Sequence, residues 1–192
     1  MTAQDTEPTG FESLWAEAAA IWEERQNEPA FEGYVSADYL AVYHSLKKYQ
    51  RRGLTFLEWG SGLGVATIMA DQMGFDAYGI EIEPKLVEHA CCLADQFDSE
   101  AKFACGSFIP SDYEESSRDG EEFHRTVCDA AAAYDDFDRE LRDFDIVYAY
   151  PWPDEHLVFR SIIRRCGAPH ALLICYDARE GIKTIKFGKQ RA

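Results

Sequence analysis

Three glycines at alternate positions, Gly60, Gly62 and Gly64, follow a short apolar segment that ends in Glu58. A helix-compatible segment comes next, so the pattern predicts a strand, a tight turn and the start of a helix. Glycine lets the backbone of such a turn approach a ligand closely, and the N–H groups at the helix start are free to meet it. A second apolar segment ends in Glu81, where a carboxylate can accept hydrogen bonds from two ribose hydroxyls. The two motifs therefore predict a site for a nucleotide-like cofactor.

The residue types at this turn discriminate between two kinds of cofactor. A dinucleotide fingerprint needs a small residue at position 65, where this chain has Val65. Glu58 suits a cationic ligand, such as the amino group and sulfonium of S-adenosylmethionine, better than a pyrophosphate. We therefore expect S-adenosylmethionine, with Ser61 included in the site, and a nicotinamide-dependent oxidoreductase is the less favoured alternative. A glycine turn that only packs a helix against a sheet is the structural alternative, which the presence of Glu81 at a fitting separation disfavours.

Aromatic residues cluster at 148–153, at the end of a predicted strand over 144–149. Tyr148 is included in the predicted cofactor site, and Tyr150 and Trp152 are predicted to position the substrate. All three offer aromatic surfaces that suit a planar substrate or a substrate ammonium. Pro151 and Pro153 stiffen this segment because the proline ring fixes φ. The alternative is that the two prolines simply start the next helix, with Trp152 packed beneath it. A proton released during a reaction could pass to Tyr150 or to one of the next residues, Glu155 and His156.

The bulk properties exclude several classes of protein. A chain of 192 residues, 46% of them hydrophobic, is most simply one globular unit. Its net charge of −16 argues against a general nucleic-acid-binding surface, so we expect a small-molecule or protein substrate. No segment has the apolar length of a membrane span, and the N-terminus does not resemble a signal peptide. The six cysteines form no C-x-x-C pair, and no metal-ligand spacing links the histidines. We interpret the cysteines as reduced core residues of a cytoplasmic protein.

Hydrophobic periodicity predicts an N-terminal helical segment over 1–53. The first helix has an inward face of Phe11, Leu14, Trp15, Ala18 and Trp22. The second is expected to begin at Ser36 as N-cap and to run to about Arg52, with Gly53 closing it.

Strands and helices alternate over 54–192, which predicts an α/β domain with a doubly wound, mostly parallel sheet. Strands are expected at 54–58, 76–82, 102–105, 144–149, 171–176 and 182–187, and helices at 65–73, at 84–97 and from Pro153. We expect a surface loop over 111–122. The segment 127–141 is compatible with a helix, but its charges are dense on several faces. Only one strand fits after the fifth, so the sheet edge needs cover from the N-terminal helices or from a second subunit in a homodimer.

Residues 54 to about 187 resemble the class I S-adenosylmethionine-dependent methyltransferases. The segment 58–64 is similar to the first motif of that family, and Gly79-Ile80-Glu81 is similar to the second. The resemblance implies that Glu81 holds the ribose, that Ile82 packs on the adenine, and that Ser107 and Phe108 lie near the adenine amino group. Many members of the family carry an acidic residue where this chain has Ser107. The Tyr150–Pro153 segment differs from the Asn/Asp-Pro-Pro-aromatic loop of amino-directed members.

Two shorter segments, 34–38 and 81–84, are similar to small lysine methyltransferases that modify an ATP synthase subunit. That likeness implies that Tyr34 reaches over the cofactor, and the alternative is a tyrosine packed between helices. The expected function is therefore S-adenosylmethionine-dependent methyl transfer to an acceptor that the sequence does not name. A non-catalytic module that binds the cofactor or a protein partner is the alternative.

Overall fold

The computed structural model describes residues 9–51, 53–114, 126 and 130–187. Its elements in chain order are α1 (Glu12–Arg25), η1 (Pro29–Phe31), α2 (Tyr39–Lys47), β1 (Thr55–Trp59), α3 (Val65–Gln72), β2 (Asp76–Glu81), α4 (Pro84–Gln96), β3 (Lys102–Cys105), η2 (Tyr134–Phe137), η3 (Leu141–Asp143), β4 (Ile146–Ala149), α5 (His156–Cys166), β5 (Leu172–Asp177) and β6 (Gly181–Lys186). The predicted α/β class is confirmed.

One six-stranded sheet runs through the molecule in the order β3-β2-β1-β4-β5-β6. All neighbouring strands pair in parallel except β5 and β6, which pair antiparallel. The strand order reverses between β1 and β4, and a cleft forms at such a switch point, beyond the carboxyl ends of the strands. The sheet therefore places its ligand-binding edge where the glycine turn, Glu81 and Tyr148 all emerge.

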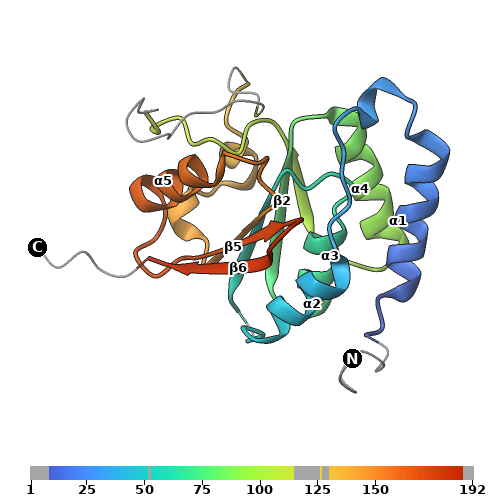
Figure 1. Ribbon diagram of the computed structural model, residues 1–192, viewed down its shortest axis with the longest axis horizontal. Coiled ribbons are helices and arrows are strands. Elements are labelled where there is room, and N and C mark those ends of the chain that lie inside the picture. Colours follow the sequence, from blue (N-terminus) through green and yellow to red (C-terminus); the bar gives the residue numbers. More distant parts are fainter. Residues whose placement is uncertain (1–8, 52, 115–125, 127–129, 188–192) are drawn as a thin grey trace, which may run out of the picture.

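Helices cover both faces of the sheet (Figure 1). Helices α1 to α4 lie on one face, packed on Phe56 and on the other side chains that point the same way, and α5 lies on the opposite face, packed on residues such as Leu57. Alternate residues of the central strands enter different cores, so β1 and β4 are buried along nearly their whole length. Helix α2 contacts the edge strand β6, and so the N-terminal helices help to cover that end of the sheet.

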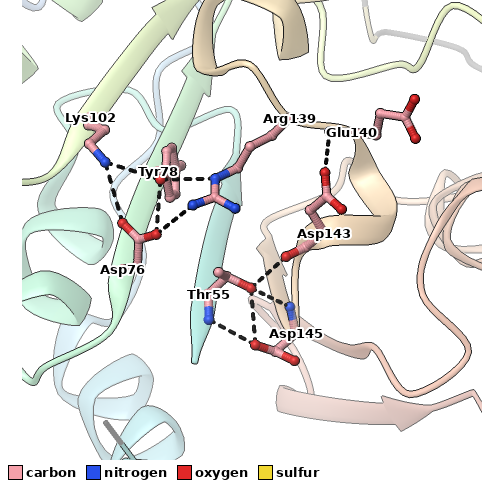
Figure 2. A network of polar contacts seen from close by, with 8 residues as sticks. All are labelled: Thr55, Asp76, Tyr78, Lys102, Arg139, Glu140, Asp143 and Asp145. Atoms are coloured by element: carbon pink, nitrogen blue, oxygen red, sulfur yellow. Dashed lines mark hydrogen bonds and ion pairs between the residues drawn. The ribbon is translucent and has the colours of Figure 1, made fainter. Parts of the chain in front are cut away.

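A polar network joins the strands at the edge opposite the glycine turn (Figure 2). The hydroxyl of Tyr78 donates to Asp76 (2.9 Å) and accepts from Lys102 (3.1 Å) and from Arg139 (3.0 Å). Close by, the Asp145 carboxylate accepts a hydrogen bond from the backbone N–H of Thr55 (2.9 Å). These contacts tie together the amino ends of the strands, and leave their carboxyl ends for a ligand.

The second helix is shorter than predicted. It begins after Asp38, whose carboxylate accepts a hydrogen bond from the N–H of Ala41 (3.0 Å), and it ends at Lys47. Asp38 is therefore the N-cap in place of Ser36, because its extended backbone aims the carboxylate at the free N–H groups of the first turn. The first helix is confirmed, although Trp22 on its predicted inner face is 38% exposed.

Two other segments are less helical, in the parts that the structure describes, than their sequence patterns indicated. Helix α5 begins at His156 rather than at Pro153, because Asp154 has a φ of +76° that an α-helix cannot contain. The described part of 127–141 contains short 3-10 turns and a parallel β-bridge between Ala132 and Ser107 but no α-helix, and Asp138, with φ +53°, ends the first 3-10 turn. Residues 127–129 and most of the predicted 111–122 loop lie outside the described residues.

The cysteines are less buried than predicted. Cys175 is in the core, whereas Cys91, Cys92 and Cys105 are exposed and Cys166 is half-buried. Cys105 is at the end of an edge strand, so its side chain lacks the cover that a central strand would give. Cys128 lies outside the described residues. None of the helices that the structure describes has the length and apolar character needed to cross a membrane.

Candidate functional site

A cavity of about 960 Å³ opens at the carboxyl ends of the central strands. Eleven of the twelve residues predicted for the site line it. They are Glu58, Gly60, Ser61, Gly62, Glu81, Ile82, Ser107, Phe108, Tyr148, Tyr150 and Trp152. The fold thus brings together residues that are up to 94 positions apart in the chain.

The glycine turn has the conformation that its sequence predicts. Gly60, Gly62 and Gly64 all have positive φ values, of +68°, +54° and +73°. The N–H groups of Gly60 and Ser61 both donate to the carbonyl of Ile80 at 2.9 Å, which anchors the turn to β2. A Cβ atom on Gly60 would meet none of the described residues within 4 Å, and the backbone there lines the cavity.

Gly64 is the one predicted residue that does not line the cavity. A Cβ atom at this position would lie 2.6 Å from the Phe103 ring and 2.9 Å from Cβ of Ala90. Gly64 therefore permits the close packing of α3 against β3 and α4.

The carboxylate of Glu81 is held by backbone N–H groups. Its Oε2 accepts from Gly62 (2.8 Å), and its Oε1 accepts from Ile82 (2.8 Å) and from Glu83 (3.0 Å). A carboxylate offers about four acceptor positions. One acceptor position on Oε2 is therefore left for a hydroxyl group of a ligand. The three backbone hydrogen bonds fix the direction in which this oxygen points.

Glu58 is almost completely buried beneath the turn. Its Oε2 accepts from both the N–H (2.9 Å) and the hydroxyl (2.6 Å) of Thr67, in the first turn of α3. Burial raises the pKa of Glu58 to about 8, against the effect of these two hydrogen bonds. The carboxyl group is thus mostly protonated at neutral pH, and it gains its charge readily when a cation arrives.

Phe108 and Ile82 form apolar walls of the cavity. The Phe108 ring stacks on Trp59 at a centroid distance of 4.9 Å. The backbone carbonyl of Phe108 accepts a hydrogen bond from the Tyr134 hydroxyl (2.6 Å). Ile82 is 37% exposed although it is a large apolar residue. Ser107, in contrast, is buried, and its hydroxyl accepts from the N–H of Ile109 (3.1 Å).

The predicted acceptor residues line the cavity on the other side of β1. Tyr148 pairs with Glu58 across β1 and β4, so the two side chains lie on the same face of the sheet. Tyr150 meets Tyr176 edge to face at 4.8 Å. Trp152 approaches the N-terminal segment, since a Cβ atom on Gly33 would lie 3.8 Å from its ring.

Two hydroxyl groups in the cavity wall are buried without a partner. Tyr148 is 2% exposed and Ser61 is 5% exposed, and neither hydroxyl has a hydrogen-bond partner in the described structure. Burial, and next the charge of Glu58, raises the pKa of Tyr148 well above its ordinary value, so the phenol stays neutral. An unsatisfied buried hydroxyl costs about 1–3 kcal/mol. Both groups are therefore suited to bind a ligand.

The N-terminal segment covers the glycine turn. The Tyr34 ring lies so close to Gly62 that a Cβ atom there would be 2.5 Å from Cε2. Its hydroxyl lies 3.1 Å from that of Tyr39 and 3.3 Å from that of Ser36. Tyr34 lines the cavity and also packs against the core, and its reach over the cofactor stays a prediction.

Sequence reasoning missed a charged group at the β5–β6 turn. Asp177, Arg179, Glu180 and Lys183 line the cavity there, and Asp177 is 3.4 Å from the ring of His156. Asp177 ends β5 at the same edge of the sheet as Glu58 and Glu81. An acidic residue at the carboxyl end of a predicted strand was the sequence signal that could have identified Asp177 as a site residue. Among the described residues no group of His, Cys, Asp and Glu side chains has the arrangement of a metal site.

Comparisons with known proteins identify the fold. No family model and no curated protein matches the sequence. An RNA methyltransferase from Salinibacter ruber, solved with S-adenosyl-L-homocysteine, has a TM-score of 0.57 at 14% identity, over 83% of this chain and 97% of that one. A methyltransferase from Geobacter sulfurreducens has a TM-score of 0.54 at 18% identity, over 88% and 72% of the two chains. The sheet order and these similarities together show that the chain has the fold of the class I S-adenosylmethionine-dependent methyltransferases.

Proposed function

We propose that the protein is an S-adenosylmethionine-dependent methyltransferase. The observation that carries the proposal is one cavity in which a fixed carboxylate at Glu81, an open glycine turn and a buried acid at Glu58 converge. A ribose fits the Glu81 carboxylate, a ligand chain that lies close to the backbone fits the glycine turn, and a cationic group fits Glu58. The RNA methyltransferase from Salinibacter ruber, which has the same fold, was solved with S-adenosyl-L-homocysteine.

The residues of the chain fit the cofactor in detail. The free acceptor position on Glu81 suits a ribose hydroxyl, and Ile82 and Phe108 supply the apolar surfaces that an adenine ring needs. Ser61 offers its unpartnered hydroxyl to the polar end of the ligand. Glu58 lies where an ionised carboxylate would stabilise the ligand's positive charge.

We assign one part of the cavity to the methyl acceptor. Small-molecule sites commonly measure about 300–1,000 Å³, and this cavity lies near the upper limit of that range. Its lining also includes Tyr150 and Trp152, which we assign to the acceptor. Bound S-adenosylmethionine supplies an electrophilic methyl group, so the chain mainly needs to orient the acceptor and to exclude water.

Calorimetric titration with S-adenosylmethionine and with S-adenosylhomocysteine tests the cofactor assignment. We expect both ligands to bind with micromolar Kd and to raise the melting temperature, while the oxidised nicotinamide cofactor gives neither effect. Absence of heat and of a thermal shift with both sulfur ligands would refute the assignment.

Transfer of a labelled methyl group into fractions of a cell extract tests catalysis. Label in a defined fraction supports the enzyme and gives its acceptor class. Tight cofactor binding without transfer to any fraction would instead favour a non-catalytic binding module.

A further inference from the structure

The charges around the cavity discriminate between classes of acceptor. Among the described residues that line it, seven carry carboxyl groups and only two carry a permanent positive charge. The carboxyl residues are Glu32, Glu58, Glu81, Glu83, Asp154, Asp177 and Glu180, and the cations are Arg179 and Lys183. Even without Glu58, whose carboxyl group is mostly protonated at neutral pH, six carboxyl groups accompany two cations, and such a lining repels phosphate and attracts cations.

One of the two cations is neutralised locally. The ammonium of Lys183 contacts the carboxylate of Glu180 and lies 3.9 Å from that of Asp177. Asp177 also accepts hydrogen bonds from the N–H groups of Arg179 (2.8 Å) and Glu180 (3.1 Å), so the β5–β6 turn holds this carboxylate in place. On the acceptor side of the cavity the carboxylates of Asp154, Asp177 and Glu180 therefore outnumber the cations Arg179 and Lys183 by one, which gives this side a negative formal charge.

Aromatic rings accompany the carboxylates on that side. Tyr148, Tyr150 and Trp152 all line the cavity from β4 and the segment that follows it. Aromatic faces together with nearby carboxylates are the surroundings that favour an organic cation. The unpartnered Tyr148 hydroxyl is a second and independent observation, because a buried, neutral phenol needs a hydrogen-bonding ligand.

We propose that the methyl acceptor is an amine that is positively charged in solution, and that Tyr148 accepts a hydrogen bond from its N–H group. This proposal rests on the proposed methyltransferase function. The ammonium first loses one proton to water, because only the neutral amine has a free electron pair. That pair then forms the N–C bond while the C–S bond of the cofactor breaks and its electrons remain on sulfur. The products are a methylated ammonium and S-adenosylhomocysteine.

Tyr148 acts in this step as a positioning group that touches the substrate. A neutral phenol cannot serve as the base, but its oxygen can accept from one N–H and so turn the electron pair of the nitrogen toward the methyl group. The register of β1 and β4 places Tyr148 next to Glu58, at the boundary between the cofactor and acceptor sides.

Four probes test the acceptor class with labelled S-adenosylmethionine. Spermidine is a small molecule that carries amines, and poly-L-lysine carries amines on a polypeptide. An RNA oligonucleotide and catechol are methyl acceptors of other chemical classes. We expect at least tenfold more transfer to one of the amines than to RNA or catechol, and the favoured amine tells a small-molecule acceptor from a protein. Preference for RNA or catechol, or transfer to none of the probes by a protein that binds S-adenosylhomocysteine, would overturn the proposal. Failure to bind S-adenosylhomocysteine would instead refute the proposed function.

A binding measurement provides a readout apart from activity. We expect titration of the better amine into the protein saturated with S-adenosylhomocysteine to give heat that decreases as salt is added. Asp154→Asn should weaken this binding about threefold, since it removes one of the exposed carboxylates. Asp138→Asn is the matched control, because both aspartates are exposed and have positive φ, but Asp138 lies outside the cavity. Equal effects of the two substitutions would overturn the electrostatic part of the proposal.

Tyr148→Phe tests the hydrogen bond. We expect kcat/KM for the amine to decrease about tenfold, with an unchanged Kd for S-adenosylhomocysteine. Tyr113→Phe is the control, because the Tyr113 hydroxyl is also buried without a partner in the described structure but does not line the cavity. A Tyr148→Phe variant that transfers methyl groups normally, or that loses cofactor affinity instead, would show that Tyr148 does not contact the acceptor.

Discussion

The carboxylate of Glu81 accepts a hydrogen bond from the backbone N–H of Gly62 at 2.8 Å, and this bond connects the end of β2 to the centre of the glycine turn. The two motifs that indicate a cofactor in the sequence are thus one physical unit. A ligand that binds Glu81 is also placed against the turn, and loss of the carboxylate affects both.

Glu81→Gln is expected to weaken cofactor binding about 10- to 100-fold, equivalent to about 1.5–3 kcal/mol. The amide keeps one acceptor oxygen but points an NH₂ group at a backbone N–H that donates in the native protein. Calorimetry with S-adenosylhomocysteine measures the effect. Glu88→Gln, on the exposed face of α4, is the control, and equal affinity of the two variants would contradict the ribose assignment.

Gly62→Ala is expected to destabilise the protein by more than the strain of its positive φ alone, which is about 1–2 kcal/mol. The added methyl group would collide with the Tyr34 ring at 2.5 Å. Gly53→Ala provides the strain without the collision, since its φ is +80° and no atom lies within 4 Å of its Cβ position. Urea unfolding measures both variants.

A double-mutant cycle separates the two causes. In a Tyr34→Ala background, Gly62→Ala should lower the free energy of unfolding by only about as much as Gly53→Ala does, because the Tyr34 ring is gone. An unchanged cost would show that Tyr34 does not cover the turn in solution.

The buried Glu58 carboxyl makes stability depend on pH. Because burial raises its pKa from 4.5 to about 8, the folded state holds this proton more tightly than the unfolded state between those values. The contribution of Glu58 to stability is complete below pH 4.5 and is lost as the pH rises through about 8, with a slope of up to about 1.4 kcal/mol per pH unit. Urea unfolding at several pH values in this window measures the slope.

Glu58→Gln is expected to flatten that part of the pH profile. The amide oxygen can replace Oε2 and keep both hydrogen bonds from Thr67, so the variant should fold. Its affinity for S-adenosylmethionine should also lose the increase toward pH 8 that an ionising carboxylate gives the wild type. A variant with the same pH profiles as the wild type would exclude Glu58 as the titrating group.

Tyr134→Phe is expected to lower the free energy of unfolding by about 1–3 kcal/mol. The hydroxyl accepts from the indole N–H of Trp59 (3.1 Å) and donates to the carbonyl of Phe108 (2.6 Å), so its removal leaves two buried polar groups unpaired. Phe108 lines the cavity, and cofactor affinity should decrease as well. Tyr49→Phe, outside the cavity, is the control in both urea unfolding and calorimetry.

The strand and helix order was predictable because it depends on local signals. Apolar periodicity, the glycine turn and the proline at the start of α4 act over a few residues, and the predicted strands match β1 to β6 within one or two residues at each end. Helix ends were less predictable where two capping residues compete, as Asp38 and Ser36 do at α2. The region after β3 could not be predicted because dense charge on a helical pattern does not supply a buried face.

The sequence by itself thus determined the fold class and the residues at the carboxyl ends of β1, β2 and β4. Only the tertiary structure decided which of these side chains are buried, paired or open to a ligand. It removed Gly64 from the cavity wall, added Asp177 and its neighbours, and left the Tyr148 hydroxyl without a hydrogen-bond partner among the described residues. The physical reason is that turns and periodicity act along the chain, whereas desolvation, the proton on Glu58 and the charge of a cavity arise from residues that meet only when the sheet has formed.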